Sequence, residues 1–204
     1  MNKTNEYEEL YKEVKDFLDI KVWKTKKSRM NSEDRYLKYN FLSEVILNEY
    51  SVCMLALSVI TLSQKDAKFD LLNLVLSILL LGVTLIVTCF RFKETANEYK
   101  NSYTQILLIE DQLNDLLLRI NNQCLKEIDP YESFMNIKRN YQDILSNTPN
   151  HKYIDFLLMK KNSKKDKLEK KQNIYYHFRI VFGSFILIII FLIPLSLIFY
   201  KLFY

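Results

Sequence analysis

The chain has 204 residues, and 29 Lys and Arg against 24 Asp and Glu make its formal net charge +5 at pH 7. It contains only two glycines and three prolines. This composition favours long helices and excludes phosphate-binding loops built on clustered glycines. Three cysteines and two scattered histidines fit neither a disulfide framework nor a metal site. We therefore expect no enzyme, no catalytic residue, no metal and no cofactor.

The N-terminal forty residues are polar, so we expect no signal peptide. Apolar residues between Tyr7 and Leu18 recur at helical spacing and predict a short amphipathic helix. A basic patch follows at residues 21–29. Asn31 or Ser32 is a candidate cap for a new helix that leads toward the first apolar run.

Three apolar runs predict membrane-spanning helices. The second, Leu71–Phe90, has twenty residues without a charge, which as a helix rise about 30 Å, the thickness of a bilayer's hydrocarbon core. The third run is Ile180–Tyr200. The first is the weakest, because it reaches sufficient length only when it extends from Gln64 back to about Leu42. The short link at residues 64–70 joins the first two spans into a hairpin.

The distribution of Lys and Arg predicts the orientation of the chain in its membrane. Residues 1–40 carry ten of these cations, residues 64–70 carry two and residues 91–179 carry sixteen. We expect the N-terminus and the 91–179 region to be cytoplasmic, the 64–70 link to lie outside, and the C-terminus to lie outside after the third span.

A heptad pattern follows the second span and predicts a self-associating helix, hence a homo-oligomer. Apolar residues alternate four and three positions apart from Phe92 to Cys124, and only Glu110 interrupts them. Glu110 could set the register of an oligomer or lie on the exposed edge of an intramolecular bundle. The central residues of this predicted oligomer seam are Tyr99, Tyr103, Ile106, Leu113, Leu117 and Ile120.

No glycine or proline separates the second span from this heptad region until Pro130, which predicts one continuous helix over residues 71–128. A further helix is expected at about residues 131–146, and Asn150 is expected to cap the helix that enters the third span. The predicted fold is an all-α membrane protein: a transmembrane helical hairpin continues into a long cytoplasmic helical stalk, and a C-terminal transmembrane helix follows. The expected regions are 1–40, 41–91, 92–172 and 173–204.

Two segments resemble a known bacterial family. One is Trp23-x5-Arg29-Met-Asn-x3-Arg35; the other runs from Tyr141 to Phe156 and contains Asn-His-Lys-Tyr-Ile-Asp. Together with the hairpin and the long helix, they resemble the SLATT family, whose members are two-transmembrane effectors found beside nucleotide-signalling and other defence genes. The likeness covers about residues 15–160, and the second segment is similar to a branch associated with reverse transcriptases. The resemblance implies a membrane-damaging or pore-forming effector; the third span departs from the two-span core.

Polar residues recur on single faces of the first two spans. They are candidates to line a water-filled path, or to pack the helices together through hydrogen bonds. In the first span they are Asn48, Ser51 and Ser58, and in the second Asn73, Ser77, Thr84 and Thr88. Glu49 is the strongest candidate for a pore-lining residue. A carboxylate within an apolar span is energetically costly unless it is protonated, paired or facing a pore. The alternative is that the span begins later and Glu49 lies at the headgroups.

Outside the spans, His151 and Asp155 lie one turn apart. A catalytic role has no nucleophile motif to support it, and a helix-start role is the simpler interpretation. A lysine cluster before the third span is expected to contact anionic lipid or, less directly, nucleic acid in a partner complex. Its members are Lys160, Lys161, Lys164, Lys165 and Lys167.

Two function classes compete. The first is an oligomeric membrane effector in anti-phage defence, pore-forming or membrane-disrupting and switched on by a partner or signal. The second is a membrane anchor or scaffold that holds a reverse transcriptase or a complex containing nucleic acid. The trigger, the subunit number and the partner are not encoded in any recognisable motif.

Overall fold

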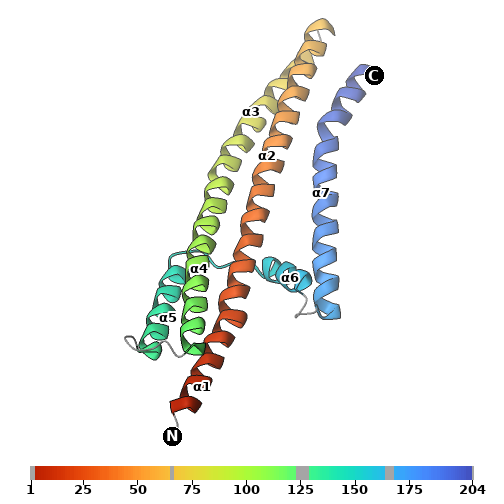
Figure 1. Ribbon diagram of the computed structural model, residues 1–204. Helices are drawn as coiled ribbons and strands as arrows, with labels where there is room; N and C mark the ends of the chain where they lie inside the picture. The colour runs from red at the N-terminus through yellow and green to blue at the C-terminus, as the bar shows by residue number, and fades with distance from the viewer. Residues whose placement is uncertain (1–2, 65–66, 123–128, 164–167, 204) are drawn as a thin grey trace. The chain divides into compact units, whose positions relative to one another are not determined.

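The computed structural model describes residues 3–64, 67–122, 129–163 and 168–203, and every element in these ranges is a helix (Figure 1). The elements are α1 (Lys3–Asp16), the π-helical turn η1 (Phe17–Val22), α2 (Trp23–Gln64), α3 (Ala67–Cys89), α4 (Phe92–Asn121), α5 (Pro130–Ser146), α6 (Tyr153–Asn162) and α7 (Lys170–Phe203). Three of the helices are long and apolar enough to cross a membrane. The all-α fold class with three candidate spans is thus confirmed.

The chain divides into two compact units. One, here called the core unit, comprises Met1–Arg35 and Glu94–Leu168; the other, the span unit, comprises Tyr36–Lys93 and Glu169–Tyr204. The N-terminal segment therefore packs with the region after the second span. Helix α2 contributes its first part to the core unit and its longer remainder to the span unit.

The core unit is built around one apolar face of each of its longer helices. Residues 10, 14, 18 and 22 of α1 and η1 repeat every four positions, a longer period than the 3.6 residues of an α-helical turn. The wider π-helical turn at Phe17–Val22 keeps this stripe on one side. The Phe17 ring packs edge-on against the rings of Phe134 and Tyr141, at centroid distances of 5.7 and 5.4 Å. The buried cluster is Leu10, Val14, Leu18, Val22, Ile106, Ile109, Leu113, Leu116, Ile120, Phe134, Ile137 and Tyr141.

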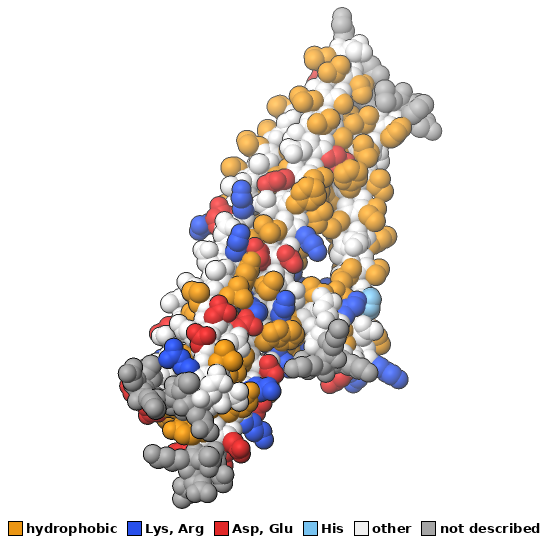
Figure 2. Space-filling model, in the orientation of Figure 1, with side chains coloured by type: hydrophobic (Ala, Val, Ile, Leu, Met, Phe, Trp, Pro, Cys, Tyr) orange, Lys and Arg blue, Asp and Glu red, His pale blue; other side chains and the backbone are white. Residues whose placement is uncertain are grey.

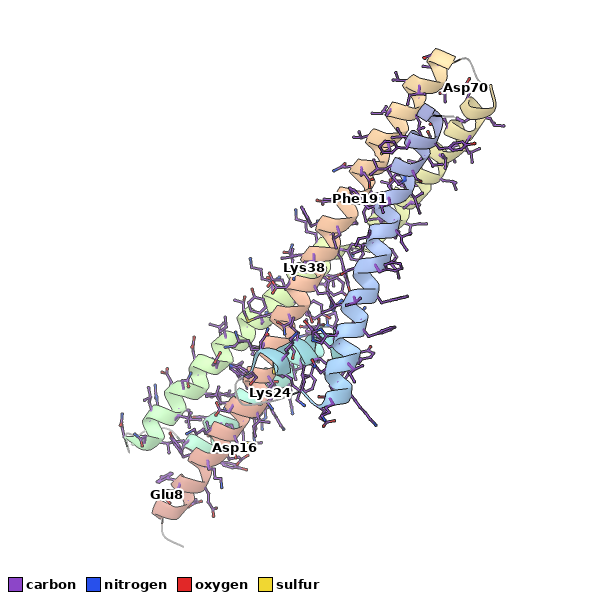
Figure 3. All side chains as sticks on the ribbon, turned by 90° about the vertical axis from the view of Figure 1, so that its right-hand side faces the viewer. Glu8, Asp16, Lys24, Lys38, Asp70 and Phe191 are labelled. Carbon is purple, nitrogen blue, oxygen red and sulfur yellow. The ribbon has the colours of Figure 1, made fainter. Side chains whose placement is uncertain are left out.

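The span unit has a much smaller buried interior. Within it, Cys53, Leu57 and Thr61 lie four residues apart and form the buried face of α2. The Tyr50 hydroxyl donates a hydrogen bond of 2.9 Å to the Ile190 carbonyl on α7, and α7 carries Phe191 beside α2 in Figure 3. Figure 2 shows hydrophobic side chains gathered over the outer surfaces of α2, α3 and α7. Such surfaces suit a lipid environment, because hydrocarbon is as apolar as the side chains themselves.

The structure corrects three expectations about helix boundaries. The predicted continuous helix over 71–128 is wrong, because α3 ends at Cys89 and α4 begins at Phe92; its last part, residues 123–128, lies outside the described residues. Arg91 has a φ of 47°, and Phe90 N–H bonds the Val87 carbonyl at 3.1 Å in a tightened last turn. Phe90 stacks on Phe92 at 5.4 Å, and this aromatic packing supports a left-handed residue where no glycine marks the break.

The second correction concerns Asn31 and Ser32, which lie inside α2 and do not begin a helix. The third concerns Asn150. Helix α6 begins at Tyr153 and ends at Asn162, and α7 begins separately at Lys170. The Asn150 carbonyl instead accepts a 3.0 Å hydrogen bond from the Tyr99 hydroxyl. Polar groups in both segments bond to residues far away in the sequence, which sequence spacing does not reveal.

Candidate functional site

Among the described residues, one direct contact joins the polar residues of the first two spans. Asn73 Nδ2 on α3 donates to Ser58 Oγ on α2 at 2.6 Å, and Ser58 Oγ donates in turn to the Met54 carbonyl at 2.9 Å. Asn73 Oδ1 is shielded from solvent and has no partner within the described residues. Thus Ser58 and Asn73 link the hairpin within one chain and leave one acceptor for a further donor.

The other residues of the stripe satisfy their hydroxyl groups locally. Ser51, Ser77, Thr84 and Thr88 each donate to the carbonyl four residues earlier, at 2.8–2.9 Å. Thr84 is half-buried, whereas Ser51, Ser77, Thr88 and also Asn48 are exposed. A hydroxyl paired to its own helix can face lipid or water. Their role in lining a path or packing another helix stays a prediction.

Glu49 lies on a different face of α2 from Asn48 and Ser51. It precedes Cys53 and Leu57 by one and two turns, on the buried side of the helix. Both carboxylate oxygens are shielded from solvent and make no hydrogen bond in the described part of the chain. An apolar environment penalises an unpaired carboxylate strongly. Glu49 is therefore a half-buried residue on the apolar side of α2 whose carboxylate has no partner among the described residues.

The predicted oligomer seam lies within the chain's own core. Tyr99, Ile106, Leu113 and Ile120 are buried, and the last three belong to the cluster formed with α1, η1 and α5. Tyr103 and Leu117 are only half-buried, at the flanks of this face. The structure thus places these residues against helices of the same chain, the alternative to a seam between subunits.

Sequence reasoning missed three of the eight buried residues of α4. Ser102, Ile109 and Leu116 are buried in place of Tyr103, Glu110 and Leu117. A two-helix seam is narrow, whereas a helix packed on several partners buries a wider stripe. Glu110 forms an ion pair with Lys26 of α2. It therefore joins two helices of one chain.

Asp155 holds α6 against α2 and is only 2% exposed. Its carboxylate accepts from Arg35 Nε at 2.8 Å and Arg35 Nη2 at 2.9 Å, and from the Ser32 hydroxyl at 2.7 Å. It also accepts from the backbone N–H of Lys152 at 3.0 Å, as a residue in the first turn of a helix commonly does. Asn31 Nδ2 donates to the Asp155 carbonyl at 2.9 Å. These contacts explain Asp155 as a clamp between the helices.

Two further titratable groups lie near this clamp. Arg29 is fully buried, and Nη1 donates to the Ser102 hydroxyl, whereas Nε and Nη2 have no partner in the described structure. Burial lowers the pKa of Arg29 from its ordinary value. Burial also lowers the pKa of His151, which Asp155 raises and Arg29 lowers further. The His151 imidazole is therefore favoured in its neutral form.

Comparison with known families decides the chain's membership. The SMODS and SLOG-associating 2TM effector domain family 5, abbreviated SLATT_5, matches residues 11–200. The chain belongs to the SLATT family. This membership confirms the family resemblance that the sequence motifs indicated. The association with reverse transcriptases stays a prediction. No curated protein and no solved structure matches the chain.

Membership makes this SLATT chain a membrane effector of a defence-associated family. Of its lysine cluster, Lys160 is half-buried with Nζ 5.8 Å from the Phe156 ring centroid, and Lys161 is exposed. Lys164, Lys165 and Lys167 lie outside the described residues. Contact of this cluster with lipid or nucleic acid stays a prediction.

Proposed function

We propose that this SLATT chain acts in anti-phage defence by assembling in the bacterial inner membrane and opening a path for ions. A partner or an infection signal switches it on. The proposal requires polar groups within the spans that have no hydrogen-bond partner in a single chain. It also requires span surfaces that the same chain does not cover, so that a second copy can pack on them. The proposed mechanism involves no covalent chemistry.

The observation that carries the proposal is the state of Glu49. Its two oxygens are shielded and unpartnered in the described part of the chain, and burial of such a group in an apolar bundle is unfavourable. A water-filled path or a donor from a second chain would satisfy it. Asn73 Oδ1 in α3 is likewise shielded and unpartnered among the described residues, so it too would accept a hydrogen bond from water or from a second chain.

Assembly through the spans fits the distribution of exposed apolar side chains better than assembly through α4. The α4 face is covered by helices of the same chain. By contrast, α3 exposes large apolar residues along its length, Leu74, Ile78 and Leu85 among them. In lipid these apolar faces are free for close packing, and hydrogen bonds such as one to the unpaired Asn73 Oδ1 would supply the specific contact between chains.

Ion leakage from liposomes loaded with a fluorescent dye and containing the purified protein tests the proposal. We expect Glu49→Gln to lower cation selectivity or conductance, because it removes the negative charge at the path. Thr84→Leu is expected to narrow and dry the path. Glu44→Gln is the matched control, because Glu44 is exposed and already accepts a 2.8 Å hydrogen bond from Asn40.

Equal leakage by wild type and both variants at equal incorporation would contradict a path lined by these residues. Absence of leakage from every preparation, with or without other defence proteins, would favour the second class of function. In that case the chain would serve as an anchor for a partner such as a reverse transcriptase, and its basic residues would provide the contact surface.

The proposed orientation places the N-terminus and residues 91–179 in the cytoplasm and the C-terminus outside. In a variant without native cysteines, Ser163→Cys should be shielded from an impermeant thiol reagent in intact cells. Lys65→Cys should be labelled under the same conditions. The reverse pattern of labelling would overturn the orientation.

A further inference from the structure

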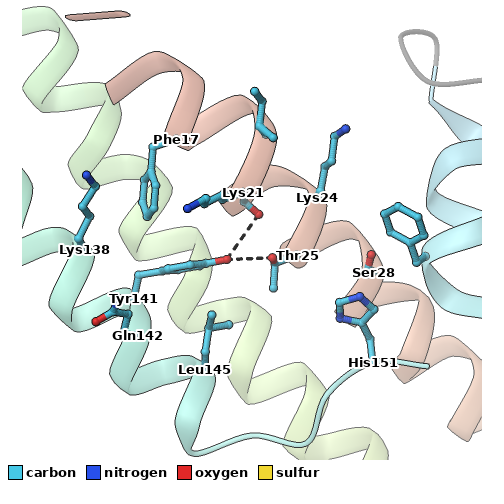
Figure 4. Close-up of a pocket in the computed structure, with 12 residues that line it drawn as sticks. Phe17, Lys21, Lys24, Thr25, Ser28, Lys138, Tyr141, Gln142, Leu145 and His151 are labelled. Carbon is cyan, nitrogen blue, oxygen red and sulfur yellow. Dashed lines mark hydrogen bonds between the residues drawn. The ribbon is translucent and has the colours of Figure 1, made fainter. Parts of the chain in front are cut away.

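The core unit contains an open-sided cavity of about 570 Å³ that the membrane function does not use (Figure 4). Side chains of η1, α2, α5, α6 and the segment before α6 line it. Pockets that bind small molecules commonly measure about 300–1,000 Å³. The cavity is therefore large enough for a ligand of moderate size.

The charge of the cavity is positive. Lys21, Lys24 and Lys138 line it, and none of its lining residues is Asp or Glu. Lys138 Nζ also donates to Glu13 at 2.6 Å, but Glu13 is not a lining residue. Arg29, buried beside Ser28, adds a further cation whose charge acts on both Tyr141 and His151. Such a surface favours an anion.

The cavity also presents a buried hydroxyl group without a partner. Ser28 is 1% exposed, lines the cavity, and its Oγ makes no hydrogen bond among the described residues. The other hydroxyls there are occupied: Tyr141 donates to Thr25 Oγ1 at 2.8 Å (Figure 4). Buried polar groups in proteins are nearly always paired. An unpaired hydroxyl at a cationic cavity points to a bound acceptor.

The remainder of the lining is apolar and partly aromatic. Phe17, Ile20, Leu145 and Phe156 contribute to it, and the Tyr141 ring is held edge-on to Phe17. An inorganic ion alone would leave this apolar lining exposed to water, whereas the flat ring of a larger ligand would pack against it. The segments around Ser28 and His151, more than 120 residues apart, meet here.

We propose that this cavity binds a small phosphorylated molecule that carries a flat ring, of about the size of a nucleoside monophosphate. Lys24 and the Ser28 hydroxyl contact the phosphate, and the aromatic and aliphatic lining covers the ring. The phosphate of a lipid headgroup shares part of this chemistry. The ring-binding surface favours the soluble ligand, and the experiment separates the two sources.

The experiment measures binding to the full-length protein in detergent micelles by isothermal titration calorimetry. The probes are adenosine and uridine 5′-monophosphate, adenosine, inorganic phosphate and a short-chain phosphatidic acid. We expect saturable binding of at least one nucleoside monophosphate, at least about tenfold tighter than adenosine or phosphate alone. Ser28→Ala and Lys24→Gln should each weaken it about tenfold, because each loses one hydrogen bond to a charged group.

Lys100→Gln is the control, because Lys100 is exposed on α4 in the same unit and does not line the cavity. It should bind like wild type. Thermal unfolding of each variant in the same detergent confirms that the small substitutions leave the fold intact. Absence of binding by both nucleotides, binding by phosphatidic acid alone, or undiminished binding by both folded cavity variants would overturn the proposal.

Discussion

The core unit and the span unit use apolar side chains in opposite ways. In the core unit, one face of each longer helix is buried, and charged residues such as Asp155 and Glu110 have partners within the chain. In the span unit, buried residues on α2 are few, and Glu49 has no partner in the described structure.

The difference lies in the apolar interior, which a single chain fills in the core unit, although Arg29 and Ser28 have unpaired polar atoms there among the described residues. Burial of apolar surface from water stabilises the core unit, so its helices must face each other. The spans gain little from facing each other in lipid, and polar or packing contacts decide their association. Each prediction below compares a residue in one environment with a matched residue elsewhere.

The largest effect is expected from Leu113→Asp, which places a charge in the fully buried core of the core unit. The loss of stability should reach about 4 kcal/mol. Leu108→Asp on the same helix, where Leu108 is 60% exposed, should change stability by no more than about 0.5 kcal/mol. Thermal unfolding followed by circular dichroism measures both. If Leu113→Asp instead dissociates an oligomer of well-folded chains, the α4 face joins subunits.

Asp155→Asn is expected to have the next largest effect. It removes the charge that two nitrogens of Arg35 contact and leaves a shielded guanidinium, at a loss of about 3 kcal/mol. Asp111→Asn, at an exposed position on α4, is the matched control. Chemical unfolding of both variants provides the comparison. A loss no larger for Asp155→Asn than for Asp111→Asn would show that the clamp does not stabilise the unit.

A smaller effect is expected within the span unit. Ser58→Ala, Asn73→Ala and the double variant form a cycle that isolates the hydrogen bond between the first two spans. The coupling should be about 0.6 kcal/mol, the average for such bonds in a membrane protein. Steric trapping or unfolding in mild detergent measures it. If the losses of stability of the two single variants add up to that of the double variant, the hydrogen bond between Asn73 and Ser58 does not stabilise the unit.

The smallest expected effect is a pH dependence that arises from His151. Burial lowers the pKa of His151 below its ordinary 6.5, so the unfolded chain binds a proton more readily than the folded chain. The contribution of His151 to the free energy of unfolding is therefore complete above about pH 6.5. It declines as the pH falls toward the lowered pKa, because protons then stabilise the unfolded chain. His151→Asn should flatten the stability profile in that range. An unchanged slope would show that His151 does not titrate differently on folding.

Much of the architecture follows from sequence pattern alone. Apolar runs of about twenty residues such as Leu71–Phe90 require helices in a membrane, because an unpaired backbone cannot lie in hydrocarbon. The heptad spacing likewise predicted an apolar face on α4. The partner of that face was not predictable, since another subunit or the chain's own helices would bury the same residues.

The composition and periodicity of this chain determined its class, its three candidate spans and the apolar faces of its helices, because these depend on local spacing. Only the tertiary structure decided that Arg91 takes a left-handed conformation. It alone decided that Asp155 contacts Ser32 and Arg35, and that Ser28 and His151 line one cavity. Such contacts join residues far apart in the sequence, and they depend on how side chains fill the space between helices.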